Sequence, residues 1–331
     1  MKKKYDVFGI GNALVDIVTE VDEDFLKKFE VEKGLMTLVD EERQQQLMSG
    51  IHLPGSIMKC GGSAANTIIS VSQFGGKSFY SCKVAKDELG AFYLKDLGEN
   101  MVDTNLTFDK AKEGITGRCL VMTTPDAERT MNTFLGITAD FSVDEIDVEA
   151  LKASTWLYIE GYLVTSEQGR EAMKTAKKIA EANGVKTALT FSDPSMVKYF
   201  RKEMVEVIDG SIDFIFCNES EAMLYTETND LAGAFAGLKN TAAEFVITRS
   251  AKGAMVYDGH STIEIAPFPV NAIDANGAGD LFAGAFLYGI TNGLSYADAG
   301  RLASRASSKV VAQFGPRLTE EEAKAVYREL F

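Results

Sequence analysis

One segment of the chain has residue types and an order suited to phosphoryl transfer. Residues 274–280 read Asp-Ala-Asn-Gly-Ala-Gly-Asp, and the apolar run 281–286 follows directly. A helix that begins here offers unpaired backbone N–H groups and the positive end of its dipole, which together bind anions. Gly277 and Gly279 would let an anion approach the backbone, with Asp280 beside it as a base. A plain glycine-rich loop is the alternative for a bare G-x-G-D, but the longer string favours a kinase.

The elements that must position this segment alternate between short apolar strands and amphipathic helices. The clearest helix pattern spans residues 166–183, and Thr165 with Gln168 is expected to form its capping box. Residues 254–263 read as a hairpin with an Asp-Gly turn. This alternation predicts an α/β fold with a central, mostly parallel sheet and helices on both faces. The remaining strand candidates are Tyr5–Ile10, Ser78–Val84, Trp156–Glu160, Thr187–Phe191, Ile212–Cys217 and Phe245–Thr248.

Two regions, approximately residues 17–50 and 105–136, break this alternation with half-polar strands. We interpret them as a small β lid that is inserted in a single domain spanning residues 1–331. An exposed lid sheet needs a cover on its outer face, and short helices are expected at 24–29 and 40–48. A covered lid has no need to dimerise, so we expect a monomer or a weak homodimer.

Composition and charge argue against several classes of function. The 331 residues are 46% apolar, and 48 acidic against 34 basic residues give a net charge of −14. This charge argues against nucleic-acid and anionic-membrane partners, and no apolar run is long enough to cross a bilayer. The four cysteines lack C-x-x-C spacing, which favours a reduced, cytoplasmic protein. With only two histidines, a His-ligated zinc site or a Ser-His-Asp hydrolase is disfavoured.

Two further segments are suited to hold a small polyhydroxyl substrate. Gly61 and Gly62 precede a helix pattern and would let a polyol approach the backbone, while Asn66 offers a donor and an acceptor. Asn12 and Asp16 follow the first strand, where a carboxylate can accept two hydrogen bonds from a vicinal diol. A simple turn between two elements is the alternative for either segment alone.

Two of these segments resemble the signatures of the PfkB (ribokinase-like) carbohydrate and nucleoside kinases. Residues 274–280 are similar to D-T-x-G-A-G-D, with Ala275 in place of threonine, and residues 60–67 are similar to the family's glycine-pair motif. The resemblance covers essentially the whole chain. It implies a ribokinase-like fold and the in-line transfer of the γ-phosphoryl group of ATP to a primary hydroxyl, with Mg²⁺ as a cofactor.

The resemblance also implies the roles of individual residues. Asp280 would accept the hydroxyl proton, while the amides of Gly277, Ala278 and Gly279 stabilise charge on the transferred group. Arg129 resembles a lid arginine that reaches the phosphates when the lid closes. Closure would exclude water and suppress the hydrolysis of ATP.

The nucleotide and metal sites are implied in the same way. Asn218 and Glu221 match the family's N-x-x-E motif and would orient waters around Mg²⁺. The family often holds a monovalent cation near the position of Asp274, so K⁺ is a further candidate cofactor. Ser250 stands where the family's nucleotide loop commonly has glycine. Contacts to ATP are expected from Asn218, Thr248, Gly253, Asn276 and Ser307.

Within this family, several features of the sequence resemble those of the adenosine kinases. They are the start Gly11–Asp16, the helix-bearing lid, Asn276 and the run Glu160-Gly161-Tyr162. Adenosine would then be converted to AMP, a reaction of purine salvage, and Asp16 would bind the ribose. A purine needs an apolar slot with an aromatic face. The candidate base contacts are Leu14, Leu38, Phe134 and Tyr162.

Three other interpretations remain beside this one. Ser195 falls where adenosine kinases tend to present an aromatic residue, so a fructokinase, ribokinase or 2-keto-3-deoxygluconate kinase type is the main alternative. A non-catalytic nucleoside-binding protein is disfavoured because Asp280 and the anion cradle are intact. A nicotinamide-dependent oxidoreductase is disfavoured because Leu14 stands where a dinucleotide fingerprint has its third glycine.

Overall fold

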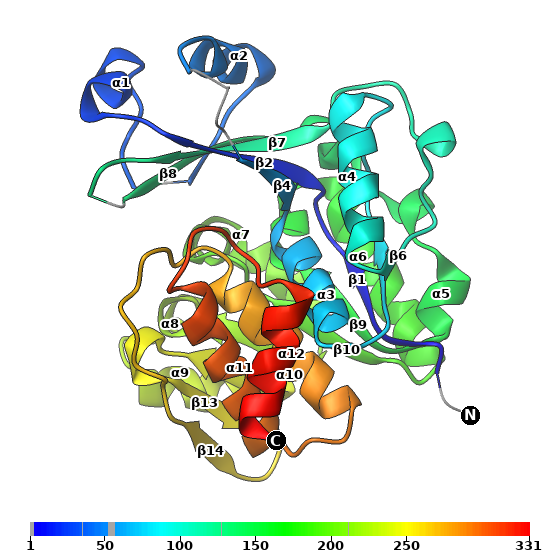
Figure 1. Cartoon of the computed structure of the whole chain (residues 1–331). Coiled ribbons are helices and arrows are strands. Elements are labelled where there is room, and N and C mark those ends of the chain that lie inside the picture. Colours follow the sequence, from blue (N-terminus) through cyan, green and yellow to red (C-terminus); the bar gives the residue numbers. More distant parts are fainter. Residues whose placement is uncertain (1–2, 35, 52–56, 127, 211) are drawn as a thin grey trace.

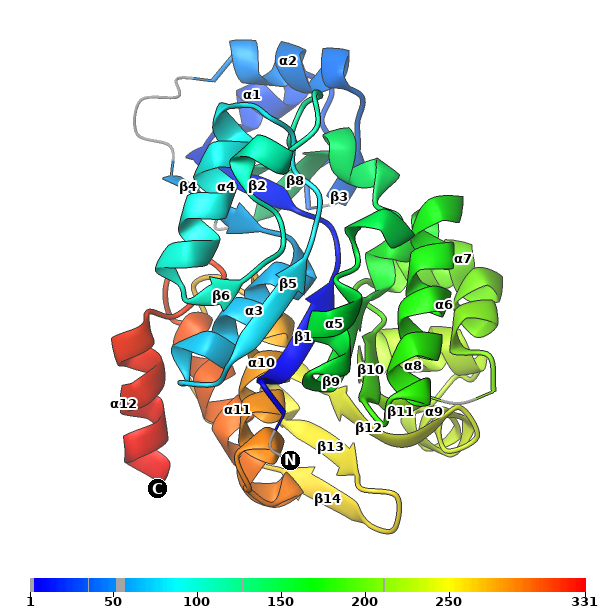
Figure 2. The same cartoon turned by 90° about the vertical axis from the view of Figure 1, so that its right-hand side faces the viewer.

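The computed structural model describes residues 3–331 except 35, 52–56, 127 and 211, and it leaves the side chains of Ile57 and Arg129 undescribed. A large α/β body lies beneath a smaller lid (Figures 1 and 2). All neighbouring strands of the body sheet are parallel except those of the two pairs that include residues 254–257, at one edge, which confirms the expected mostly parallel sheet. From edge to edge its strands are β14 (Thr262–Ile265), β13 (Ala254–Tyr257), β12 (Ala242–Thr248), β11 (Ile212–Asn218), β10 (Lys186–Thr190), β9 (Ser154–Glu160), β1 (Tyr5–Ile10), β5 (Ser78–Ser81) and β6 (Val102–Asp103).

Helices cover both faces of this sheet because its strands are apolar on both sides. Along β11, Phe214 and Phe216 belong to one core and Ile215 and Cys217 to the other. The first core packs against α3 (Ser63–Gln73), α4 (Glu88–Glu99), α10 (Ala278–Thr291), α11 (Tyr296–Val310) and α12 (Glu320–Leu330). The second packs against α5 (Val148–Lys152), α6 (Glu167–Ala182), α7 (Pro194–Ile208), α8 (Glu219–Thr226) and α9 (Leu231–Leu238).

The lid is a second sheet in the order β3-β8-β7-β2-β4. Helices α1 (Glu23–Lys28) and α2 (Glu41–Ser49) lie on the side of this sheet away from the body (Figure 1). The buried Gln44 fixes α2 there, because its amide donates to the carbonyls of Arg118 and Asn132. The strand β4 (Ile57–Gly61) was not expected from the sequence; its last residue, Gly61, is the first of the glycine pair Gly61-Gly62. The lid strands are β3 (Met36–Leu38), β8 (Arg129–Phe134), β7 (Gly117–Thr123), β2 (Leu14–Glu20) and β4 (Ile57–Gly61).

Local details differ from the sequence-based expectations at the start of α6. Ser166 is the N-cap residue, and its side chain accepts from the backbone N–H of Gly169 at 3.0 Å. The expected capping box of Thr165 and Gln168 is wrong, because the Thr165 hydroxyl donates to the Tyr162 carbonyl in the preceding 3₁₀ turn. All four cysteines are free and buried. No helix in the described part of the chain is long and apolar enough to cross a bilayer.

Close packing of α10 on α3 brings the first turns of these two helices together. A Cβ atom at Gly284 of α10 would lie 2.5 Å from the Thr67 carbonyl oxygen and 2.5 Å from the Ser70 Cβ on α3. The absence of a side chain at Gly284 therefore sets the spacing of the two helices. Ser63 lies at the N-terminal end of α3 and Asp280 at that of α10, and their side chains form a hydrogen bond. The spacing of the two helices therefore affects this contact in the site.

We predict that Gly284→Ala lowers the free energy of unfolding by about 1–3 kcal/mol, the usual cost of overpacking a core. Gly98→Ala in α4 is the matched control, since a Cβ atom there meets nothing within 4 Å. The control should leave stability unchanged or raise it by about 0.5–1 kcal/mol. Urea denaturation of both variants measures these changes. Equal effects of the two substitutions would contradict the proposed packing constraint.

Candidate active site

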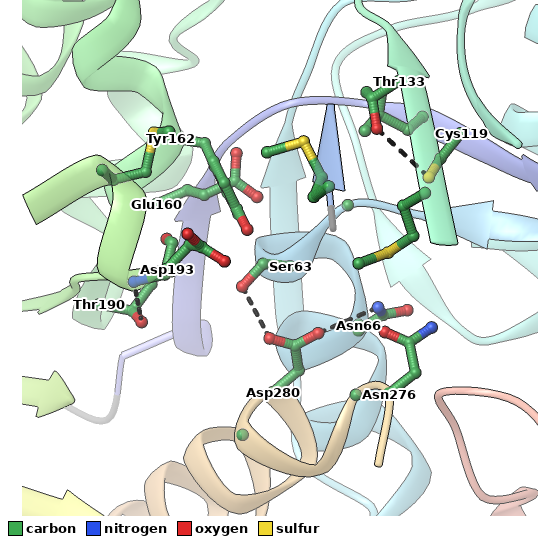
Figure 3. Close-up of a pocket in the computed structure, with 18 of the residues that line it drawn as sticks. Ser63, Asn66, Cys119, Thr133, Glu160, Tyr162, Thr190, Asp193, Asn276 and Asp280 are labelled. Carbon is green, nitrogen blue, oxygen red and sulfur yellow. Dashed lines mark hydrogen bonds between the residues drawn. The ribbon is translucent and has the colours of Figure 1, made fainter. Parts of the chain in front are cut away.

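The lid and the carboxyl edge of the body sheet enclose a cavity of about 570 Å³ (Figure 3). One wall comes from the ends of β9, β10, β11 and β12 and from the start of α10. The opposite wall comes from lid strands β2, β3, β7 and β8. Open α/β sheets bind their ligands at the carboxyl ends of their strands. Most of the site residues expected from the sequence line this cavity.

Asp280 lies in this cavity at the first turn of α10, and two side chains of α3 hold its carboxylate (Figure 3). The Ser63 hydroxyl donates to Oδ1 at 2.7 Å, and the Asn66 amide donates to Oδ2 at 3.1 Å. Burial raises the pKa of Asp280 to about 6, while these two hydrogen bonds oppose the rise because they favour the ionised form. Asp280 is thus ionised at neutral pH and is a stronger base than an ordinary aspartate.

The backbone beside Asp280 forms the start of α10 and leaves space for an anion. Gly277 is the N-cap residue with φ of 73°, and a Cβ atom there would lie 2.3 Å from the Pro316 carbonyl oxygen. Gly279 lines the cavity, and a Cβ atom there would meet nothing within 4 Å. An open space at a helix N-terminus fits a phosphate group.

Ser307 and Ala278 support this backbone and do not line the cavity. The Ser307 hydroxyl on α11 donates to the carbonyl oxygen of Ala278 at 2.9 Å. Ser307 therefore supports the anion cradle, and its expected contact with the nucleotide stays a prediction. One turn of α11 is tied in this way to the start of α10.

Asn12, Asp16, Gly62 and Asn66 surround a polar part of the cavity, as expected for a polyol site. A Cβ atom at Gly61 would lie 2.1 Å from Oδ1 of Asp16. Gly61 does not line the cavity, so its role is to leave room for the Asp16 carboxylate. Gly62 has φ of 94°, and a Cβ atom there would lie 2.3 Å from the Asn12 carbonyl oxygen. Both glycines are thus required by the close approach of β4 to the start of β2.

Glu160 is a site residue to which the sequence analysis assigned no role. Its side chain is fully buried at the end of β9 and accepts the backbone N–H groups of Asn12 at 2.7 Å and Ala64 at 2.9 Å. Burial raises its pKa to about 7, and the two backbone hydrogen bonds oppose this rise. An acidic residue at the end of an apolar strand is a pattern that could have indicated it.

The lid side of the cavity is mostly apolar, and its polar residues are Asp16, Glu128 and Thr133. Side chains alternate along β8, so Met131 and Thr133 line the cavity whereas Phe134 faces away from it. Phe134 instead packs against the Arg118 guanidinium, which lies 5.8 Å from the ring centroid, so the expected base contact at Phe134 is corrected. Tyr162 lines the cavity from the body. The apolar residues on the lid side are Leu14, Met36, Leu38, Cys119, Val121, Met131 and Leu135.

Asn218 and Glu221 line another part of the cavity and cap the start of α8. Each side chain accepts a hydrogen bond from the backbone N–H of the other, and the Asn218 amide also donates to Glu221 Oε1 at 2.8 Å. Burial raises the pKa of Glu221 to about 7. No group of three or more His, Cys, Asp or Glu side chains with metal-ligand spacing occurs among the described residues. The pair of Asn218 and Glu221, with one carboxylate, fits Mg²⁺ that is held mainly through waters and substrate phosphates.

The loops around the anion cradle account for four more expected residues. Thr248 and Asn276 line the cavity. Gly253 does not, because it forms the turn between β12 and β13 with φ of 83°, where a Cβ atom would lie 2.0 Å from the Ile265 carbonyl oxygen. Asp274 accepts the N–H groups of Asn276 at 2.9 Å and Gly315 at 2.8 Å, and a monovalent cation near it stays a prediction. Arg129 begins β8, and its side chain lies outside the described part.

Asp193 is a second cavity residue that the sequence analysis missed. It is the N-cap residue of α7 and accepts from the Ser195 N–H at 2.7 Å and from the Ser195 hydroxyl at 2.5 Å. The preceding Ser192 has φ of 68°, a conformation that is rare for serine. The sequence Ser-Asp-Pro at the end of a strand could have indicated this cap, because proline favours the first position of a helix.

Comparison with known proteins decides the family. Residues 50–323 match the pfkB family carbohydrate kinase. The chain belongs to the PfkB family. The solved adenosine kinase from Sinorhizobium meliloti is 34% identical, with a TM-score of 0.91, and the match covers 98% of this chain and 99% of that one. A probable sugar kinase from Rhizobium etli CFN 42 is 32% identical, with a TM-score of 0.91, and the match covers 99% of this chain and 100% of that one. Adenosine kinase 2 of Arabidopsis thaliana is 25% identical, covering 93% of this chain and 94% of its own.

The PfkB match and the observed sheet together confirm the ribokinase-like α/β fold expected from the sequence. PfkB kinases use ATP with Mg²⁺, and the open backbone at Gly279 and the single carboxylate of Glu221 fit these groups. When bound, Mg²⁺ supplies positive charge to the phosphates during their transfer.

The pH dependence of this PfkB kinase should report the environment of Asp280. We expect kcat/KM for the preferred acceptor to fall as the pH drops through about 6, because a protonated Asp280 cannot accept the hydroxyl proton. Ser63→Ala removes a donor that favours the ionised form, so the midpoint should move to higher pH. Ser70→Ala in the same helix, whose hydroxyl has no hydrogen-bond partner in the described part of the chain, is the matched control. A Ser63→Ala midpoint equal to or below that of the wild type would refute the assigned contact.

Proposed function

We propose that this chain is an ATP-dependent kinase that phosphorylates the primary hydroxyl of a nucleoside, with adenosine converted to AMP. The observation that carries the proposal is the division of one cavity into two chemically different parts. Asn12, Asp16, Asn66 and Asp280 form a polar part that suits a ribose. The lid wall opposite is mostly apolar, with Asp16, Thr133 and Glu128, which directly precedes β8, as its polar residues.

An apolar wall favours a purine over a second set of hydroxyl groups. The base would pack against the thioethers and aliphatic side chains of the lid, with Tyr162 on the body side. A sugar in the same place would lose hydrogen bonds to water without replacement, and each unsatisfied polar group costs about 1–3 kcal/mol. The S. meliloti structure, which is that of an adenosine kinase, supports the same acceptor.

The chemistry assigned to the polar part follows from its geometry. Asp16 and Asn12 orient the ribose, and the carboxylate of Asp280 accepts the proton of the attacking hydroxyl. The N-terminal end of α10, at Gly277–Gly279, faces the phosphoryl group and stabilises its charge with backbone N–H groups that are already in place. Asn66 both holds Asp280 and keeps its carbonyl oxygen without a partner among the described residues, so it can accept from a substrate hydroxyl.

A sugar kinase is the second candidate, and the body side of the cavity favours it. Thr190, Ser192 and Asp193 line the cavity with polar atoms that could bind the hydroxyl groups of a sugar. Ser195 also leaves this helix start without the aromatic residue expected for an adenosine kinase. The similarity to a probable sugar kinase from R. etli is consistent with this alternative.

Turnover tests separate these candidates. We expect ADP formation from Mg-ATP with adenosine and much slower formation with ribose, fructose or 2-keto-3-deoxygluconate. Asp280→Asn should lower the rate by about 10²–10⁴-fold, the usual contribution of a general base. Asp298→Asn, which changes a half-buried first-turn aspartate of α11 that does not line the cavity, is the matched control and should leave the rate unchanged.

Each other outcome excludes part of the proposal. Turnover with a sugar alone would keep the kinase and reject the nucleoside. Binding of adenosine without turnover of any acceptor would favour a nucleoside-binding protein. Near-wild-type turnover of Asp280→Asn would reject Asp280 as the base.

A further inference from the structure

The lid presents a cation next to the anion cradle, and the site described above does not use it. Lys59 lies opposite Asp16 in the antiparallel pair of β4 and β2. Directly paired residues point to the same face of a sheet, and Asp16 lines the cavity. Lys59 is therefore on the cavity side of the lid, at its β4 edge.

Lys59 reaches the loop on which the anion cradle rests. Its Nζ atom lies 3.4 Å from the position of a Cβ atom at Gly315. The next residue, Pro316, contacts Gly277, and the Gly315 N–H donates to Asp274, which lines the cavity. The lysine thus stands beside the loop that supports the N-terminal end of α10.

A hydrogen-bond network fixes β4 against this loop. Asp96 of α4 accepts the backbone N–H of Cys60 at 2.8 Å and the guanidinium of Arg317 at 2.9 Å. Arg317 is 6% exposed, and its Nη1 atom has no hydrogen-bond partner in the described part of the chain. Cys60, which follows Lys59 in the chain, and Arg317 are therefore held in place by the same carboxylate.

Within the described part of the chain, Lys59 has no ion-pair partner that neutralises its charge. No carboxylate forms an ion pair with it among the described residues, since Asp96 is paired with Arg317 and Glu322 caps α12. The charged groups that face Lys59 are Arg317, Asp96 and Glu322, and burial together with Arg317 lowers the pKa of Lys59. A partly desolvated cation without a partner is costly unless an anion binds to it.

The cavity face of the lid changes in character along its strand order. Strands β3, β8 and β7 contribute mainly apolar side chains to the cavity, and β2 contributes Asp16. Lys59 on β4 comes next in the strand order, beside Asp16 and outside the residues that line the cavity. This order matches the order base, ribose and phosphate of a nucleoside that is being phosphorylated. We propose that Lys59 binds the polyphosphate of the phosphoryl donor at the β4 edge of the lid. The inference rests on the proposed ATP-dependent function.

Calorimetric titration without acceptor tests this proposal. We expect Lys59→Met to weaken binding of Mg²⁺ with the unreactive ATP analogue AMP-PNP by about tenfold, the low end for a hydrogen bond to a charged group. Lys59→Arg keeps the charge and should stay within about threefold of the wild type. Adenosine binding should be unchanged in both variants. Lys95→Met on the exposed side of α4 is the matched control.

A second measurement uses the unmodified protein. Acylation of Lys59 by an amine-reactive reagent, followed by peptide mass spectrometry, should slow when AMP-PNP and Mg²⁺ are present. Unchanged analogue binding by Lys59→Met, an equal loss of adenosine binding, or acylation unaffected by the analogue would each overturn the proposal. A wild-type protein that binds no AMP-PNP would instead reject the ATP-dependent function on which it rests.

Discussion

The carboxylate of Glu160 accepts the backbone N–H groups of Asn12 and Ala64 through two buried hydrogen bonds. Asn12 belongs to the segment that leaves the body sheet and enters the lid, and Ala64 belongs to the first turn of α3. Hydrogen bonds to a charged group are worth about 1.5–3 kcal/mol each, and a buried N–H without a partner carries a similar cost. One side chain thus ties the lid to the body at the point where the substrate hydroxyls are expected.

The consequences of this contact extend to the assigned base. Ala64 follows Ser63, whose hydroxyl holds Asp280, so the position of the Asp280 carboxylate depends on how α3 begins. The close packing of α10 on α3 at Gly284 adds a second constraint on the same distance. A proton acceptor must be held at hydrogen-bond distance from its donor to be effective. Residues outside the reacting groups therefore set the geometry of the site.

The sequence was sufficient to predict the body sheet, the strands and helices of the lid other than β4, and most of the residues that line the cavity. Apolar strands that alternate with amphipathic helices can be read directly, and the cover of the lid by α1 and α2 follows from its exposed outer face. The glycine-rich segments could be located because backbone approach restricts them to few residue types. Among the strands of the lid, β4 was missed because it is short and adjoins a turn-like glycine pair.

The misplaced residues share a physical cause. Whether a strand residue faces the cavity depends on register, which a single-residue slip reverses, and Phe134 was assigned to the wrong face for this reason. Ser307 and Gly253 lie outside the cavity lining and make backbone contacts that only the tertiary structure reveals, and their contacts with a nucleotide stay predictions. Glu160 has partners far away in the chain, so its position after an apolar strand suggests an unusual acid but not which N–H groups it accepts. Asp193 caps a helix locally, and Ser-Asp-Pro suggests the cap but not that it lines the cavity.

The most direct test of the account compares adenosine with 5′-deoxyadenosine, which lacks the hydroxyl assigned to attack. ADP formation from Mg-ATP would be measured with each compound, and 5′-deoxyadenosine would also be tested as an inhibitor. The account predicts turnover of adenosine, no turnover of 5′-deoxyadenosine and competitive inhibition by it. Phosphorylation of 5′-deoxyadenosine at a comparable rate would contradict the placement of the primary hydroxyl between Asp280 and the start of α10.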